Sequence, residues 1–173
     1  MAERFFLNEI FFSIQGESTR VGRPTTFVRL AGCPLRCGWC DTKYAFTEGR
    51  HVADDEILGE VAKYPTRTVC VTGGEPMAQR RTPELLHKLV EHGYDVSLET
   101  SGAVPLENVP EKVVRIIDVK CPGSGESHRI HWPTLERLRP TDQLKFVVAD
   151  RHDFDWALAL VQERKLREKA LVL

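Results

Sequence analysis

The sequence lacks the features that mark membrane and exported proteins. No apolar run in its 173 residues approaches the roughly 20 that span a bilayer, and the charged N-terminal stretch MAERFFLNEIFF has no small-residue cleavage site. The sequence has no large charge excess, because it contains 24 basic and 25 acidic side chains. The protein would therefore have no overall electrostatic field that attracts nucleic acid. We therefore expect one cytoplasmic domain that takes a small ligand and binds neither membrane nor nucleic acid.

Cysteine is scarce and odd in number, with five residues at Cys33, Cys37, Cys40, Cys70 and Cys121. Without an export signal, a disulfide framework is not expected. We predict that Cys70, inside the apolar run TVCVT, is a small buried hydrophobe. Cys121 is predicted to be a buried or idle thiol, with a ligand role as the alternative. The six histidines show no ligand spacing, and His87 and His92 are expected to be exposed on a helix.

The sequence contains no repeats or low-complexity tracts, and its Gly and Pro residues are scattered as breaks between elements rather than gathered in a linker. Short apolar, β-branched stretches predict six strands, at residues 25–30, 66–72, 94–100, 112–118, 143–149 and 170–173. Helical patterns cover residues 54–64, 81–94 and 153–166. In the second of them, Thr82 is a candidate N-cap and Gly93 a candidate stop.

This alternation of strands and helices predicts parallel βαβ units, with ligand sites beyond the carboxyl ends of the strands. Six strands and three main helices indicate an α/β fold, either a partial (β/α) barrel or a curved open sheet. Residues 5–17 before the first unit are expected to add a strand or hairpin.

The stretch AGCPLRCGWCDT, residues 31–42, places three cysteines directly after the first predicted core strand. A structural zinc site is closed by four protein ligands, and none of the remaining cysteines is nearby. In a four-iron cluster, by contrast, three thiolates leave one iron open. The spacing therefore favours an iron–sulfur cluster, and a zinc knuckle is the alternative.

This CxxxCxxC loop, with Trp39 just before its third cysteine, resembles that of the radical S-adenosylmethionine (SAM) superfamily. The resemblance implies a partial barrel and a 4Fe-4S cluster on Cys33, Cys37 and Cys40 whose free iron chelates the amino and carboxylate groups of SAM. One electron, from a donor such as a flavodoxin or ferredoxin, then yields a 5′-deoxyadenosyl radical.

Three further strand ends extend the resemblance. VTGGEP, residues 71–76, resembles the turn whose backbone receives the amino group of SAM, where glycine permits close approach. LETSG (98–102) and DVKCPGSG (118–125) would lie along the ribose and carboxylate. The implied SAM-binding residues are Trp39, Asp41, Gly73, Gly74, Glu75, Ser101, Asp118 and Lys120. The plainer alternative is an ion pair of Lys120 with Asp118 or Glu99.

Within the superfamily, EIFFSIQGEST (9–19), GRPTTFVRLAGCPLRC (22–37) and CDTKYAF (40–46) resemble the 7-carboxy-7-deazaguanine synthases over nearly the whole chain. That family contracts 6-carboxy-5,6,7,8-tetrahydropterin with loss of ammonia, on the path to queuosine and related 7-deazapurines. The resemblance implies a homodimer and a Mg²⁺ ion that accepts the Thr42 hydroxyl and completes its shell with water or substrate oxygens.

The resemblance also implies substrate contacts at Ile14, Gln15, Gly16, Glu17, Arg29 and Thr72. Gln15 and Glu17, with the neighbouring backbone, would read the pterin edge, and Arg29 would clamp the substrate carboxylate with two prongs. The radical would remove hydrogen from the carbon that bears this carboxylate, and no side chain is expected to be a catalytic acid or base. The alternatives are a surface turn at QGE, a solvated Arg29 and a helix cap at Thr42.

Relatives of this family are expected to continue past the last strand with a Gln-rich closing segment, whereas this sequence ends at EKALVL. We therefore expect a single radical SAM domain over residues 1–173 without that segment. Two other functions stay open. A glycyl-radical activating enzyme shares the small size and the cysteine loop but needs a protein substrate, and a zinc-binding structural module would use the three cysteines without chemistry.

Overall fold

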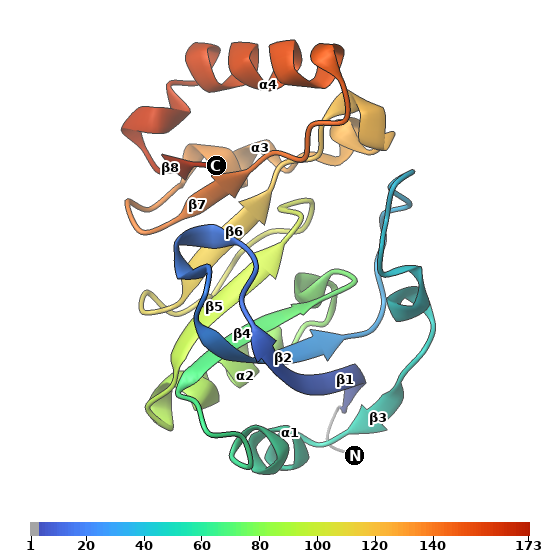
Figure 1. Cartoon of the computed structure of the whole chain (residues 1–173), viewed down its shortest axis with the longest axis vertical. Helices are drawn as coiled ribbons and strands as arrows, with labels where there is room; N and C mark the ends of the chain where they lie inside the picture. The colour runs from blue at the N-terminus through green and yellow to red at the C-terminus, as the bar shows by residue number, and fades with distance from the viewer. Residues whose placement is uncertain (1–3) are drawn as a thin grey trace.

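The computed structural model describes residues 4–173, which form one eight-stranded sheet (Figure 1). Its strands are β1 (Phe5–Ile14), β2 (Pro24–Leu30), β3 (Arg50–Val52), β4 (Thr68–Gly73), β5 (Asp95–Thr100), β6 (Val114–Asp118), β7 (Gln143–Lys145) and β8 (Leu171–Val172). They lie in the order β3-β1-β2-β4-β5-β6-β7-β8. From β2 to β8 all neighbours are parallel, and β1 is antiparallel to β2 and β3. The six predicted parallel strands and the added N-terminal strand are confirmed.

The α-helices of the described chain are α1 (Asp54–Val61), α2 (Thr82–Glu91), α3 (Trp132–Glu136) and α4 (Arg151–Glu163). Short 3-10 turns are η1 (Ser18–Arg20), η2 (Lys43–Phe46), η3 (Pro76–Ala78), η4 (Pro122–Ser124), η5 (Ser127–Arg129) and η6 (Leu166–Glu168). The three predicted helices are α1, α2 and α4. Neither α3 nor β3 was predicted, because five and three residues are too few to show a periodicity.

Several predicted boundaries were wrong. The strand expected at 143–149 ends at Lys145, because its neighbour β6 ends at the paired Asp118. The third helix begins at Arg151, where Asp150 accepts a hydrogen bond from Asp153 N and caps it. Thr82 is not the N-cap of α2, since its hydroxyl donates to Pro76 O at 2.6 Å instead.

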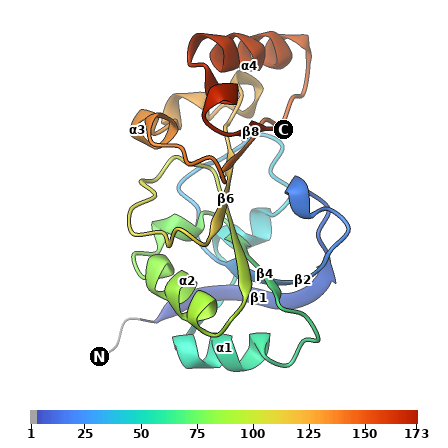
Figure 2. The ribbon, with the colours of Figure 1, turned by 90° about the vertical axis from the view of Figure 1, so that its left-hand side faces the viewer.

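Side chains alternate between the two faces of the sheet, and this alternation separates core from cavity. On one face, buried Val28, Val71 and Leu98 lie side by side in register and pack with α1 and α2 residues such as Ile57 and Leu86. The alternate positions face the other way. The view of Figure 2 places α2 and α3 on one side of the sheet and the loop between β1 and β2 on the other.

That loop reaches across the curved sheet to β7. Gln143 accepts a hydrogen bond from Thr19 N at 3.0 Å and donates one to the Thr19 hydroxyl at 2.7 Å. Glu17, in the same loop, pairs with Lys145. These contacts join the loop between β1 and β2 to a strand that stands four places from β2 in the sheet order, so the open side of a partial barrel is bridged by the chain itself. Within residues 4–173, no helix is long and apolar enough to cross a membrane.

Candidate active site

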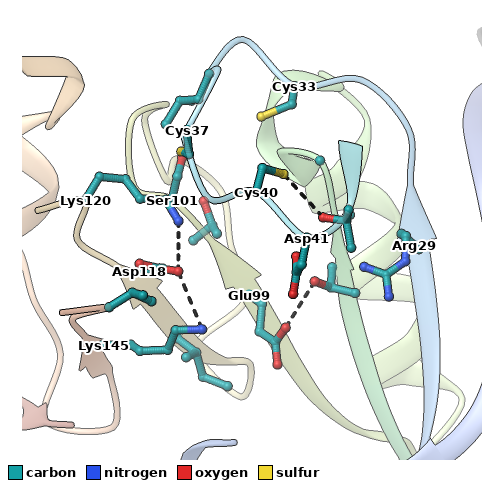
Figure 3. Close-up of a pocket in the computed structure, with 18 of the residues that line it drawn as sticks. Arg29, Cys33, Cys37, Cys40, Asp41, Glu99, Ser101, Asp118, Lys120 and Lys145 are labelled. Atoms are coloured by element: carbon teal, nitrogen blue, oxygen red, sulfur yellow. Dashed lines mark hydrogen bonds and ion pairs between the residues drawn. The ribbon is translucent and has the colours of Figure 1, made fainter. Parts of the chain in front are cut away.

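A cavity of ≈ 280 Å³ lies at the carboxyl ends of the parallel strands (Figure 3). Its wall follows from strand alternation and register. Arg29 on β2 pairs with Thr72 on β4, Glu99 on β5 pairs with Ile116 on β6, and all four residues line the cavity. The loops that follow the same strands close its upper side. This is the edge at which the sequence predicted a ligand site.

The three cysteines of the CxxxCxxC loop line this cavity as half-buried, unpaired thiols. The loop is folded by local hydrogen bonds. Cys40 N donates to Cys37 O at 3.2 Å, and Arg36 Nη1 donates to Cys33 O at 2.6 Å. These hydrogen bonds satisfy both carbonyls within the loop, and the three cysteines line the cavity.

The thiols suit an iron–sulfur cluster better than a single zinc ion. Sulfurs around one zinc would stand about 3.8 Å apart, given a Zn–S distance of about 2.3 Å and tetrahedral angles. Among residues 4–173, the only three ligands close enough to share one ion are Asp150, His152 and Asp153, and the cysteines do not form such a group. Burial raises the pKa values of Cys33 and Cys37, so both thiols need a bound cation to ionise readily.

The GGEP turn packs against the base of the cysteine loop. A Cβ atom on Gly73 would lie 2.1 Å from Leu30 O, and one on Gly74 would lie 2.3 Å from Gly32 O and 2.8 Å from Cys33 Cβ. The turn also holds the loop directly, because Glu75 N donates to Gly32 O at 2.8 Å. Glycine is therefore needed here for the contact between two loops, and both glycines line the cavity.

Glu75, predicted to bind SAM, is fully buried and lies outside the cavity lining. Its carboxylate accepts hydrogen bonds from Met77 N at 3.0 Å, Thr100 Oγ1 at 2.7 Å and Ser101 N at 2.8 Å. This side chain ties β4 to β5. The remaining residues of the predicted SAM set all line the cavity, namely Trp39, Asp41, Gly73, Gly74, Ser101, Asp118 and Lys120.

The charged groups at the ends of β6 and β7 form a network. Asp118 Oδ2 lies 2.9 Å from Lys120 Nζ and 3.5 Å from Lys145 Nζ, so the expected alternative of an Asp118–Lys120 ion pair is present. Burial acts to lower the pKa of Lys145, but Asp118 and Glu17 outweigh it and the net shift is upward. Asp118 Oδ1 is buried without a hydrogen-bond partner in the described chain, which leaves one acceptor for a bound ligand.

The predicted substrate residues divide into two groups. Glu17, Arg29 and Thr72 line the cavity, whereas Ile14, Gln15 and Gly16 lie outside its lining. Gln15 is only 3% exposed, and its amide donates to Glu99 Oε1 at 3.0 Å. Arg29 is half-buried and ion-paired with Glu9, so it is not a solvated strand residue.

Comparison with known proteins identifies the family. The sequence model of the Radical SAM superfamily matches residues 27–122, more than half of the chain. The 7-carboxy-7-deazaguanine synthase of Koribacter versatilis is 47% identical over 165 residues, which cover 94% of this chain and 73% of that protein. This chain belongs to the 7-carboxy-7-deazaguanine synthase family.

Other members of the 7-carboxy-7-deazaguanine synthase family agree. The enzyme of Chlorobaculum tepidum is 40% identical, over 96% of this chain and 77% of its own. The crystal structure of QueE from Escherichia coli superposes with a TM-score of 0.77 at 25% identity, over 92% of this chain and 78% of that one. Streptococcus suis SuiB bound to S-adenosylmethionine, at 15% identity and a TM-score of 0.56, shares the fold alone. The relatives favour neither the glycyl-radical activating enzyme nor the zinc module.

Three further predictions for this member of the 7-carboxy-7-deazaguanine synthase family concern Thr42, Cys70 and Cys121. Thr42 lines the cavity with its hydroxyl 3.7 Å from Cys40 Sγ. It occupies the N-cap position of η2, as the alternative expected, but its side chain makes no capping hydrogen bond. Cys70 and Cys121 are fully buried and lie outside the cavity lining, as predicted, and burial raises the pKa of Cys121 to about 11.

Sequence reasoning missed two charged residues of this 7-carboxy-7-deazaguanine synthase cavity, Glu99 and Lys145. The sequence does contain a signal for them, because side chains on one face of a strand recur at every second residue. Counting every second residue back from Ser101 reaches Glu99, and Lys145 ends the strand beside Asp118. Only the register of neighbouring strands shows that both side chains share the cavity face.

Proposed function

We propose that this chain converts 6-carboxy-5,6,7,8-tetrahydropterin to 7-carboxy-7-deazaguanine with release of ammonia, in queuosine and 7-deazapurine biosynthesis. One observation carries the proposal. A single cavity is lined by three free thiols, with no fourth cysteine among its described lining residues, and by the guanidinium of Arg29 (Figure 3). The 47% and 40% identity to proteins named 7-carboxy-7-deazaguanine synthase supports it.

The residues present fit the groups that this reaction needs. When bound, a 4Fe-4S cluster and SAM would supply the radical that removes hydrogen from the substrate carbon bearing the carboxylate. Cys33, Cys37 and Cys40 would hold the cluster. Asp118, with one unpartnered oxygen, suits a hydroxyl or ammonium donor of SAM. Trp39, Asp41, Gly73, Gly74, Ser101 and Lys120 would complete the SAM contacts, and Glu75 would position the loop without touching SAM.

Arg29 would bind the substrate carboxylate and hold the reacting carbon in position. Thr42 would give its hydroxyl to Mg²⁺, which takes few protein ligands and keeps water or substrate oxygens in its other positions. Glu17 and Thr72 would contact the pterin from the cavity wall. Ile14 and Gly16, in the adjoining segment, would contribute through their backbone only.

We further propose a homodimer in the cytoplasm that receives electrons from a flavodoxin or ferredoxin. In the described chain, β1 pairs with β3 only through Phe5–Leu7. On the rest of that strand, Phe12 and Ile14 are 40% and 57% exposed, which suits a protein–protein contact. Light scattering after size-exclusion chromatography should give twice the chain mass, and a monomer at micromolar concentration would contradict the dimer.

The function is tested by anaerobic reconstitution with iron and sulfide, then incubation with carboxytetrahydropterin, SAM, Mg²⁺ and a reductant. Mass spectrometry should detect 7-carboxy-7-deazaguanine together with 5′-deoxyadenosine. Formation of 5′-deoxyadenosine without the deazapurine would retain the radical SAM chemistry but reject this substrate.

A further inference from the structure

Glu99 is a carboxylate of the cavity wall that forms no direct ion pair within residues 4–173, and Lys145 interacts with it only through space. Its Oε1 accepts a hydrogen bond from Gln15 Nε2 at 3.0 Å, and its Oε2 accepts one from Thr72 Oγ1 at 3.1 Å. Within residues 4–173, no lysine or arginine forms an ion pair with it, whereas Glu17 and Asp118 of the same cavity both pair with Lys145. Figure 3 shows Glu99 below the cysteine loop.

A half-buried carboxylate without a direct ion pair is costly, because it has lost water and gained counter-charge only at a distance. The donors to Glu99 are the Gln15 amide, the Thr72 hydroxyl and the buried Cys70 thiol, all of them neutral groups. They fix the orientation of the carboxylate but do not neutralise it. A carboxylate offers about four lone pairs, so these three donors leave acceptor capacity unused. Charge and acceptor capacity are therefore left for a ligand in the cavity.

Arg29, Thr72 and Glu99 stand at one level on three neighbouring parallel strands. Arg29 is the register partner of Thr72, and the Thr72 hydroxyl reaches Glu99. Adjacent strands are about 4.8 Å apart, so the arginine and the carboxylate lie about 10 Å from each other along the sheet. This level offers a guanidinium at one end, a carboxylate at the other and a hydroxyl between them.

We propose that Glu99 binds the N3–H and 2-amino donors of the substrate's pyrimidinone ring while Arg29 binds the carboxylate at the opposite end. The proposal rests on the proposed function. A 6-carboxypterin carries two adjacent N–H donors at one end and its carboxylate at the other, so a flat ring lying across β2, β4 and β5 matches both groups. Two parallel N–H donors fit the two oxygens of a carboxylate, with the charge strengthening the pair.

Gln15 then acts through Glu99 rather than on the substrate. Its amide nitrogen holds Glu99, and its amide oxygen accepts a hydrogen bond from Glu17 N at 3.1 Å. Being buried, it is a positioning residue that links the loop carrying Glu17 to the carboxylate on β5.

The test uses two probes that bind without turnover, pterin-6-carboxylate and lumazine-6-carboxylate. In the second probe a carbonyl replaces the 2-amino group, so it would face Glu99 with an acceptor instead of a donor. The reconstituted protein with SAM should prefer the pterin by roughly 10- to 100-fold in Kd, because a site built for a donor rejects an analogue that lacks it. Glu99→Gln should reduce this preference to a few-fold at most and leave the Kd of SAM unchanged.

Glu91→Gln is the matched control, because Glu91 is exposed at the end of α2; it should keep the full preference. Equal binding of both probes by the parent protein, or an undiminished preference in Glu99→Gln, would overturn the assignment. If Glu99→Gln fails to fold, the parent's preference alone decides. If the parent protein prefers the pterin probe but converts no carboxytetrahydropterin, the proposed function is rejected. The assignment of Glu99 to the N3–H and 2-amino donors is then retained.

Discussion

Arg29 is held from behind by Glu9, its cross-strand partner, whose Oε1 accepts a hydrogen bond from Arg29 Nε at 2.8 Å. The same oxygen accepts one from the Tyr44 hydroxyl at 3.2 Å. Arg29 Cζ also lies 5.5 Å from the centre of the Phe11 ring. Bonding through Nε fixes the plane of the guanidinium and leaves its two terminal nitrogens for a planar ligand.

Replacing Arg29 by Lys should therefore weaken substrate binding although the charge is kept. A lysine cannot present two parallel donors, so we expect the KM for carboxytetrahydropterin to rise about 10-fold or more, with the Kd of SAM unchanged. Steady-state kinetics under anaerobic conditions measures both. Arg80→Lys, at an exposed position, is the control, and an unchanged KM in Arg29→Lys would rule out the clamp.

Cys37→Ala and Cys70→Ala make the same chemical change in two environments. Cys37 lines the cavity, whereas Cys70 is fully buried outside its lining. We expect Cys37→Ala to lose the iron–sulfur absorbance and all 5′-deoxyadenosine formation, because a thiolate ligand is missing. Cys70→Ala should keep both and lose only about 1 kcal/mol of stability through the small void. Iron and sulfide analysis after anaerobic reconstitution decides; a full cluster in Cys37→Ala would contradict the ligand assignment.

Gly74→Ala should displace the cysteine loop. Its new Cβ would meet Gly32 O at 2.3 Å and Cys33 Cβ at 2.8 Å, and neither atom is the end of a flexible side chain. We expect a lower Tm and a reduced iron content. Gly59→Ala in α1 has open space around its Cβ, so it should stabilise the protein by about 0.5–1 kcal/mol. Normal stability in Gly74→Ala would show that this contact can relax.

Acid should weaken the contact between α1 and α2. A hydrogen bond from Lys88 holds the pKa of Asp54 below its ordinary value of 3.8, and Arg81 donates to the same oxygen at 3.2 Å. The folded pKa is the lower one, so this stabilisation is complete above pH 3.8 and is lost as the pH falls through the folded value.

Asp54→Asn should therefore lower the Tm by about 2–4 °C at neutral pH, and the difference should vanish once the carboxyl is protonated in the parent. Thermal melts between neutral pH and pH 2 measure it. Asp55→Asn is the control, because its side chain is 91% exposed. A Tm difference that is the same at every pH would mean that the effect is not the charge.

Much of the architecture was predictable because it follows from local patterns. The six parallel strands were found from short apolar runs, and α2 from the spacing of Leu85, Leu86 and Leu89, all buried in the core. Boundaries failed where a distant partner decides them. The strand at 143–149 stops when β6 stops, and the Thr82 hydroxyl is taken by a carbonyl six residues earlier.

The sequence by itself determined the chemistry that the site can hold: three thiolates at CxxxCxxC spacing, two glycines in GGEP and an arginine before the cysteine loop. These motifs consist of residues close together in the chain, so their spacing can be read directly from the sequence. Which side chains meet the ligand was decided only by the tertiary structure. Gln15 lies outside the cavity lining, and Glu99 lies in the cavity wall without a direct ion pair in the described chain, because the register between parallel strands sets which residues share a face and a level.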